Sequence, residues 1–349
     1  MAQFDAKTWN EKVFQKYLQM IPSSRLNSFV KSGVLAVNQK LASRLVDGVG
    51  GNYLVEPIKG RLDGQVLNYD GVTDMVATSR DTFEQGKVVV GRMKAWEEKD
   101  FSTDITGEEF LPVNAMAGEV AEYYEGVDQD DIMAILEGIF NMSDEMGAKF
   151  VAAHSNDVTS VGDGKVTAGT LNQTITKASG DRKSIFRLVI MHSVVAAVLE
   201  DLQLVDYATY TDANGIQKEL GLATWNGRIV IIDDDAPVIE GEDGALSYVS
   251  YVLGTGAIEY ANCGAKVPNE MGRDPAKNGG VTMLYTRQRK LYAPKWISFT
   301  KASMARLSPT VEELKNGTNW KIVNNGQDGE NLKYVNHKFI PIARIISKA

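Results

Sequence analysis

The sequence predicts an α+β fold, in which helices and strands follow one another without a regular β-α rhythm. One observation is that apolar residues at helical spacing alternate irregularly with short apolar runs bounded by glycine and aspartate. The other is the stretch 186–237, where two apolar runs, 186–191 and 228–232, flank a helical segment at 194–204. Two buried strands with a helix between them form a packed layer, so we expect this stretch to be the core of one domain.

Composition limits the classes of function for the 349-residue chain. Its 44% hydrophobic and 23% charged residues are ordinary for a globular protein. The net charge of -8 argues against a protein that reads nucleic-acid sequence through a basic face. The single cysteine, Cys263, excludes an internal disulfide and suggests no zinc site. No apolar run approaches the ~18 residues of a membrane span, and residues 1–10 lack the apolar core of a signal peptide. We therefore expect a chain made in a reducing cytoplasm, with no membrane partner.

Residues 1–48 are expected to form a helical arm. An apolar stripe with spacings of four, four and three ends before Pro22. The stripe consists of Trp9, Val13, Tyr17 and Met20. A second helical piece at 26–45 is followed by glycines that end it. So short a segment cannot bury its stripes alone, so the arm needs a partner surface.

Residues 52–100 change character. Short strand-like runs separated by Gly and Asp turns occupy 53–55, 66–67, 72–77 and 87–90. The run 79–99 mixes both charges with isolated apolar residues, which predicts a long two-stranded excursion that needs an external contact. Its interleaved signs build no basic field, so the predicted partner is another copy of the chain. The candidate assembly contacts are Arg80, Asp81, Glu84, Lys87, Arg92, Lys94, Glu97 and Glu98.

A long apolar stripe predicts a helix over 114–140, with Asn114 as its cap. The stripe shifts phase near Gly126, which indicates one kinked helix or two abutting helices. A short helix at 167–178 is capped by Thr167 or Thr170. Beyond residue 237 we expect strands, one polar loop and a turn-rich segment. The strands are 248–259, 281–285, 291–300 and 339–346, the loop is 269–280, and the turn-rich segment is 308–330.

The pair His192-Ser193 suggests a nucleophile and its base. A hydrolase elbow needs Gly-x-Ser-x-Gly, and the residues around Ser193 contain no glycine. Ser193 follows a strand directly, where a helix N-cap belongs, and capping alone explains it.

The aspartates Asp233, Asp234 and Asp235 suggest a divalent-cation site, with Asp233 and Asp235 as ligands in a metal-dependent transferase. Such an enzyme also needs a nucleotide-binding half. The sequence holds no phosphate-binding loop, and Gly254-x-Gly256 lacks the third glycine of a dinucleotide fingerprint. A solvated turn at a strand end is the simpler interpretation. The histidines are widely spaced and match no metal-ligand spacing; they are His154, His192 and His337. We predict no catalytic, cofactor-binding or metal residues.

The order of these elements resembles that of a tailed-bacteriophage (siphophage) major capsid protein. Two phrases are similar to the hairpin exit and helix entry of that family, Gly91-Arg92-Met93-Lys94-Ala95-Trp96 and the residues 101–107. Two more are similar to its core, Ile190-Met191-His192-Ser193 through Leu199 and the residues 227–234. The resemblance implies the Hong Kong 97-type fold, which encapsulin shells share.

The resemblance also implies a domain map and a biological role. It assigns 1–48 to an N-terminal arm, 49–106 to an extended loop, 107–184 with 287–349 to a peripheral domain, and 185–286 to an axial domain. The helix 114–140 becomes the spine of the peripheral domain, and the loop 269–280 faces a capsomer axis. The implied role is a virion head protein that forms hexamers and pentamers of an icosahedral shell around packaged double-stranded DNA, without sequence-specific binding.

The implied partners are a separate scaffolding protein, a portal and decoration proteins. Some relatives cross-link a loop lysine, but Lys59, Lys87 and Lys94 match no such motif. Two alternatives stay open at this point. One is an encapsulin-like compartment shell, and the other, from a different class, is the metal-dependent transferase using Asp233 and Asp235.

Overall fold

The computed structural model describes residues 32–348 apart from 47–51, 61, 63, 65, 76, 78–79, 107–112, 212–216 and 242–243. The expected arm stripe before Pro22 lies outside these residues. Within the expected second arm helix, residues 35–37 form a strand instead, β1 (Leu35–Val37), which pairs in parallel with β11 (Ile258–Asn262). The helix that follows, α3, is short (Gln39–Val46).

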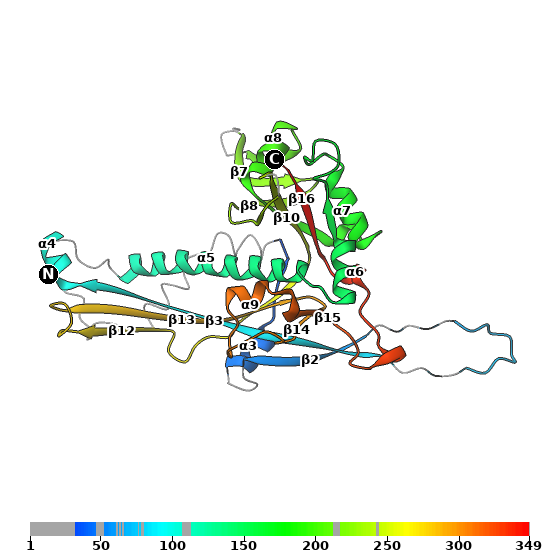
Figure 1. Cartoon of the computed structure of the whole chain (residues 1–349), viewed down its shortest axis with the longest axis horizontal. Helices are drawn as coiled ribbons and strands as arrows, with labels where there is room; N and C mark the ends of the chain where they lie inside the picture. Colours follow the sequence, from blue (N-terminus) through cyan, green and yellow to red (C-terminus); the bar gives the residue numbers. More distant parts are fainter. Residues whose placement is uncertain are drawn as a thin grey trace.

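A long sheet forms the lower part of the molecule in Figure 1, with strand order β1-β11-β13-β3-β2. Its centre is an antiparallel pair, β3 (Thr82–Lys99) and β13 (Val281–Pro294), in register from Val89↔Leu291 to Lys99↔Val281. The first half of β3 pairs instead with β2 (Tyr53–Lys59). Residues 82–99 of the charged run are therefore one strand of a larger sheet, and the partner of their first half is β2.

The helix α5 (Val113–Phe140) lies along this sheet (Figure 1). It is continuous over 28 residues, so the alternative of two abutting helices is wrong. Helices kink where a proline or an inserted group interrupts the backbone hydrogen bonds. The shift in phase of the apolar stripe is explained by a change in what surrounds the helix. The first half of α5 faces one sheet, whereas residues 132–136 are buried all round.

Replacing Gly126 with alanine should stabilise the protein by about 0.5–1 kcal/mol, because glycine is a poor helix residue. An added Cβ at this position would meet no heavy atom within 4 Å. Urea unfolding followed by circular dichroism measures the change. A clear loss of stability would mean that the position is packed or bent after all.

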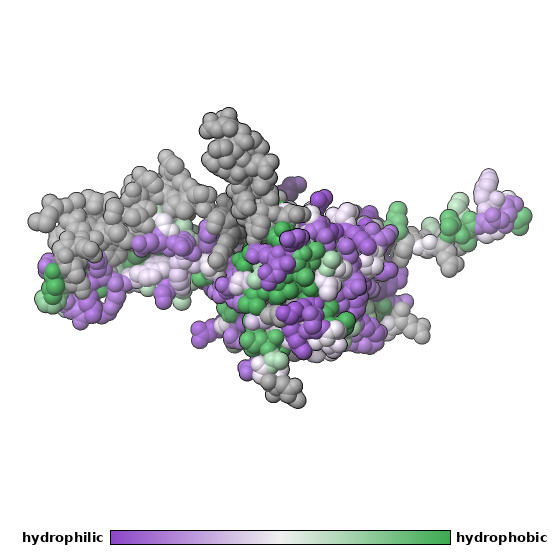
Figure 2. All heavy atoms as spheres, turned by 90° about the horizontal axis from the view of Figure 1, so that it is seen from above, coloured by the Kyte–Doolittle hydropathy of each residue, from purple (hydrophilic) through white to green (hydrophobic). Residues whose placement is uncertain are grey.

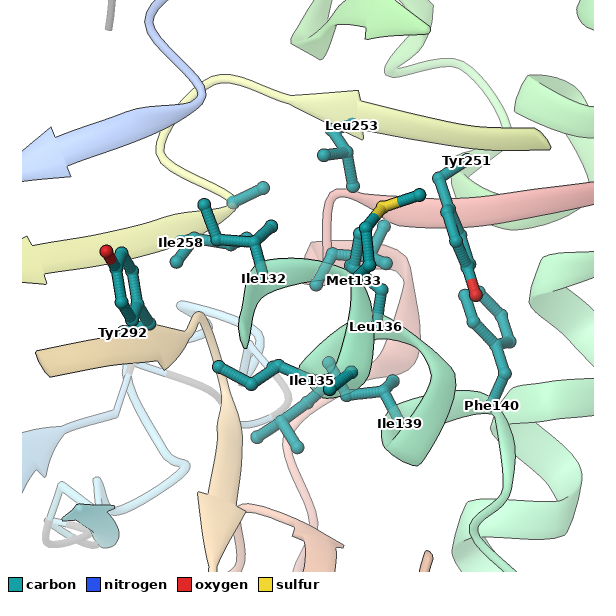
Figure 3. Packing of buried hydrophobic residues seen from close by; sticks show 14 of the residues in the cluster. Ile132, Met133, Ile135, Leu136, Ile139, Phe140, Tyr251, Leu253, Ile258 and Tyr292 are labelled. Atoms are coloured by element: carbon teal, nitrogen blue, oxygen red, sulfur yellow. The ribbon is translucent and has the colours of Figure 1, made fainter. Parts of the chain in front are cut away.

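The main core surrounds the second half of α5, between the two sheets. Ile132, Ile135, Leu136 and Ile139 are fully buried and meet side chains from both sheets, as Figure 3 shows. Among these are Leu253, at the top of Figure 3, and Tyr292, at its left. A helix that is apolar on every side is stable only when it is covered on every side, so this segment fixes where the two sheets meet.

The upper layer is an eight-stranded sheet in which seven strands follow the order β4-β16-β10-β5-β8-β7-β6 and β9 pairs with β10. Its strands are β4 (Ser155–Asp157), β5 (Phe186–Met191), β6 (Val205–Thr211), β7 (Gln217–Trp225), β8 (Arg228–Ile232), β9 (Val238–Glu240), β10 (Leu246–Gly254) and β16 (Ile342–Ser347). The expected core of 186–237 is confirmed. Strands β5 and β8 are parallel neighbours, and α8 (Ser193–Asp201) covers them together with α7 (Thr170–Ser179).

Three expectations for the later chain are corrected. The polar loop 269–280 is a hairpin, because β12 (Asn269–Asp274) pairs with β13. The strand expected over 248–259 is divided between β10 and β11 by a turn at Gly256, whose φ of 64° suits glycine. The strands expected at 281–285 and 291–300 are one strand, β13, up to Pro294. Residues 258–286 thus pair within the long sheet, although we expected them in the axial domain.

The remaining elements close the lower layer. The turn-rich segment 308–330 contains α9 (Val311–Lys315), which begins at a capping box of Thr310 and Glu313. It also contains β15 (Trp320–Ile322), which pairs with β14 (Ile297–Phe299). Helix α6 (Glu145–His154) links α5 to β4, and α4 (Asp100–Thr106) follows β3. The closing strand is confirmed as β16 (Ile342–Ser347), which begins three residues and ends one residue later than expected.

Candidate assembly interface

The excursion between β2 and β3 projects from one end of the molecule (Figure 1). At its base the Gly60 amide donates to the Asp81 carbonyl at 2.8 Å, and Arg80 Nε donates to the Gly60 carbonyl. Lys333 holds the Asp81 carboxylate at 2.8 Å. These contacts close the neck of the excursion, so its tip is held away from the body.

The tip has its own local structure. The Asp70 carboxylate accepts hydrogen bonds from the Val72 amide at 3.0 Å and from the Thr73 amide and hydroxyl at 2.7 Å each. These bonds hold the pKa of Asp70 down to about 2, with the Thr73 side chain as the first cause. The residues expected as strands at 66–67 and 72–77 are not strands where the structure describes them. An aspartate-anchored turn replaces them.

Large apolar side chains on this tip have almost no cover within the chain. They are Leu62, Val66, Tyr69, Val72 and Met75, each at least 84% exposed, and Leu67, which is half exposed. Figure 2 shows the tip standing clear of the body, with apolar and polar residues side by side. The sequence does contain a sign of this. Apolar residues between the turn signals Asp63-Gly64 and Asp70-Gly71 have no room to form a sheet.

Two of the expected assembly contacts are internal. Lys87 is 3% exposed and is bound by Glu56 at 2.5 Å and by Glu259, so it ties β2, β3 and β11 together. Arg92 holds the buried Asp131 of α5 at 2.5 Å. Burial nevertheless raises the pKa of Asp131 to about 6, with Arg92 opposing the rise. In each of these ion pairs at least one side chain is buried, so the pairs position the elements of one subunit.

The other candidates lie nearer the surface. Asp81 is bound to Lys333 as described, and Glu97 of β3 meets Lys277, in the turn between β12 and β13, at 3.4 Å. Glu84 and Lys94 are exposed, and within the described ranges neither forms an ion pair. Arg80 belongs to the neck of the excursion, and Glu98 is half-buried.

A second apolar surface lies at the opposite end of the molecule, on the arm formed by β3, β13 and α5. Met93, on the face of β3 that points away from α5, is 83% exposed. Close to it in sequence, the Trp96 ring meets the Tyr123 ring edge-on with centroids 5.3 Å apart, and Tyr123 is exposed. Phe101 and Ile105 of α4 are also largely exposed. Both ends of the long axis therefore present apolar side chains.

The residues first considered for catalysis have structural roles. The N-cap of α8 is His192, whose Nδ1 accepts from the Val194 amide at 3.2 Å; the expected cap at Ser193 is therefore wrong by one residue. The Asp234 carboxylate accepts from the Ser193 amide at 3.3 Å. Asp233 is buried against Gln129 of α5, and Asp235 is exposed. The aspartates form the expected turn, and it joins the upper sheet to α5.

Two of the histidines meet in space although they are far apart in sequence. His154 Nδ1 lies 2.7 Å from the Ile342 carbonyl, so it is the donor, and His154 Nε2 lies 3.1 Å from His337 Nδ1. Burial lowers the pKa of His154 to about 4. Within the described ranges no group of three or more His, Cys, Asp or Glu side chains is placed to hold a metal ion. Nor does any helix there combine the length and apolarity needed to span a membrane.

Comparisons with known proteins agree with this geometry. No protein-family model matches the chain. The major capsid protein of Bacillus phage SPP1 is 30% identical over 303 residues, which cover 86% of this chain and 88% of that protein. The capsid of Ralstonia phage GP4 has a TM-score of 0.52 at 10% identity over 76% of this chain and 84% of that one. The capsid of cyanophage Pam1 has a TM-score of 0.49 at 12% identity over 90% and 88% of the two chains.

A long sheet carrying a spine helix, a second sheet and a projecting excursion define a structural shell protein of the Hong Kong 97-type fold. The chain belongs to the family of tailed-bacteriophage major capsid proteins. It forms the shell of the phage head, is part of the virion and is not an enzyme. These relatives favour neither the encapsulin-like compartment nor the metal-dependent transferase.

Proposed function

We propose that copies of this chain assemble into hexamers and pentamers that close into an icosahedral shell around packaged double-stranded DNA. The observation that carries the proposal is the apolar tip of the excursion, 62–75, which a second copy would cover. Full burial of one large apolar side chain contributes about 1.5–3 kcal/mol. A tip with several such side chains can therefore hold subunits together when each makes the same contact.

The positions of the two apolar surfaces support rings. The tip and the arm of β3, β13 and α4 lie at opposite ends of the long axis (Figure 1), and Met93, Phe101 and Ile105 are exposed on that arm. When a surface at one end of a subunit binds a different surface at the other end of its neighbour, the contact is head-to-tail. Such contacts generate closed rings if the rotation between subunits closes. The exposed Lys94 lies on the arm and Asp70 on the tip, so their charges are complementary. Glu84 stays a candidate contact on the excursion.

The upper layer is proposed as the axial domain. We include 155–254 and 342–347 in it and leave the β12–β13 hairpin to the peripheral domain, following the strand pairing. Large apolar side chains just after α8, at the end of β8, on β9 and at the start of β10 favour contacts around an axis. They are Leu202, Ile232, Val238, Ile239 and Leu246, each between 42% and 50% exposed. A separate scaffolding protein, a portal and decoration proteins are proposed as further partners on the family resemblance alone.

The test replaces Val66, Tyr69, Val72 and Met75 with serine in one variant. Wild-type protein, co-expressed with its neighbouring head genes, should form shells visible by electron microscopy. The variant should fold with unchanged circular dichroism but give at least about tenfold fewer particles, because each lost apolar contact weakens every junction. Leu307→Ser, at a residue that is 80% exposed outside the tip, is the control and should assemble normally. Normal assembly of the fourfold variant would remove the tip from the interface, and a wild type that never assembles would overturn the proposal itself.

A further inference from the structure

Basic side chains gather at one edge of the upper layer, where β5 and β8 begin. This basic cluster consists of Arg182, Lys183, Arg187, Arg228 and Lys338. Leu188 and Ile229 are paired in the parallel register of β5 and β8, so Arg187 and Arg228 are neighbours one step earlier. Adjacent strands lie about 5 Å apart, and paired residues point to the same face. Two guanidinium groups are therefore side by side.

The rest of the cluster is tied to this pair. Arg228 donates to the Asn226 carbonyl at 2.6 Å and to the Lys183 carbonyl at 3.5 Å, which joins β8 to the turn before β5. The Arg182 guanidinium stacks 4.7 Å above the Phe339 ring. Lys338 precedes that ring in sequence, and its Nζ would lie 3.9 Å from a Cβ added at Gly180. The strands, the turn and the segment 337–339 thus present their cations together.

Acidic side chains among the described residues do not neutralise these cations. In the part of the chain that the structure describes, none of the cluster residues forms an ion pair with an acid, and Asp181 is exposed in the same turn. Burial and then repulsion from Arg187 lower the pKa of Arg228. Burial and then Lys338 lower the pKa of His337. The protein as a whole has a net charge of -8, so the positive charge of this cluster is opposite in sign to the charge of the whole chain.

We propose that the basic cluster binds backbone phosphates of the double-stranded DNA that the shell encloses, independently of base sequence. The inference rests on the proposed function, which supplies the DNA. Guanidinium forks match phosphate oxygens in pairs. A duplex carries one charge per about 1.7 Å of its axis, so clustered cations find phosphates at any position along it. An acidic peptide would have to order its chain to do the same, at an entropic cost. The negative charge elsewhere on the protein keeps the binding weak and local.

The test measures binding of a fluorescent DNA duplex of about 25 base pairs to unassembled full-length protein at several salt concentrations. Non-specific binding is expected, with a dissociation constant of about 10⁻⁴–10⁻⁶ M. The variant Arg187→Gln/Arg228→Gln removes two phosphate contacts. The slope of log affinity against log salt should then become less negative by about 1.8, since each contact contributes about 0.9. The control Lys266→Gln/Lys321→Gln removes the same charge from exposed sites outside the cluster and should change the slope by less than half as much.

Several results would overturn the inference. One is binding by the cluster variant that equals the wild type, and another is a wild type that does not bind DNA. Displacement of DNA by poly-glutamate at equal charge concentration would assign the cluster to an acidic peptide instead. Shell formation is scored separately by electron microscopy of both variants. If the wild type forms shells but does not bind DNA, only the proposed role of the cluster is rejected. If the wild type binds DNA but forms no shells, the proposed function is rejected.

Discussion

Replacing Gly138 with alanine is expected to destabilise the protein by about 2–4 kcal/mol, although alanine is the better helix residue. An added Cβ would overlap the Leu314 carbonyl oxygen and lie 2.5 Å from Trp320 Nε1. Trp320 Nε1 donates to that same carbonyl at 2.7 Å, and both side chains are fully buried. Alanine would therefore push α9 away from α5 and lengthen a buried hydrogen bond. Overpacking costs about 1–3 kcal/mol, and an unsatisfied buried partner costs about 1–3 kcal/mol.

The comparison with Gly126→Ala makes this result informative. Both substitutions add one methyl group to the same helix, yet Gly126 faces open space and Gly138 faces α9. The two changes in unfolding free energy should therefore have opposite signs in urea denaturation of the unassembled protein. Equal stabilisation by both would show that α9 does not approach α5 as closely as described.

The second large effect is a loss of stability in acid that depends on His154. Its side chain is 1% exposed and stacks on Phe150 with ring centroids 4.2 Å apart. Because its pKa is about 4 in the fold and about 6.5 in the unfolded chain, only the unfolded chain takes up a proton between these values. Stability is therefore complete above pH 6.5 and falls as the pH drops toward 4. One pKa unit corresponds to about 1.4 kcal/mol, so the full loss from this residue is about 3 kcal/mol.

Asp131 acts in the opposite direction. Its pKa is about 6 in the fold, above the ordinary carboxyl value, so the folded protein takes up this proton first as the pH falls. That uptake stabilises the fold between about pH 6 and pH 4. The effects of His154 and Asp131 on the free energy of unfolding partly cancel. The pH dependence of the wild type alone therefore does not separate the two contributions. A difference between variants is needed.

His154→Asn provides this difference. The amide can still donate to the Ile342 carbonyl but does not titrate. Urea unfolding at pH 7 and pH 4 should show that the variant loses about 3 kcal/mol less than the wild type over this range. His337→Asn, which removes the neighbouring ring but leaves His154 buried, should keep most of the wild-type loss, because burial is the first cause of the lowered pKa. Parallel losses in wild type and His154→Asn would show that His154 titrates normally in the fold.

The elements that the sequence predicted well are those whose apolar pattern is strong and local. The helix over 114–140 and the layer of β5, α8 and β8 were found because their residues repeat at the spacing of the element they form. β12 was missed because Asn269–Asp274 has few strand-forming residues. It is a strand because β13 offers it backbone partners, and that pairing depends on the fold of the whole chain.

The candidate contacts show the same limit. Lys87 and Lys94 look alike in a charged run, but one is buried between Glu56 and Glu259 and the other is exposed. Glu259 is 172 residues away in sequence from Lys87. No local pattern reveals such a partner, so the sequence alone could not separate internal ion pairs from surface charges. The exposed tip was missed because its apolar residues suggested strands.

One strand connects the two ends of the subunit. β3 runs without interruption from the neck of the excursion to the far arm, bonded first to β2 and then to β13. Ladder hydrogen bonds lie across the strand direction, so a pull along β3 loads many of them in shear at the same time. Tension between two neighbours in a shell would therefore pass along β3 and its ladders from one end of the subunit to the other. β3 is thus the element that mechanically links the two ends of the subunit.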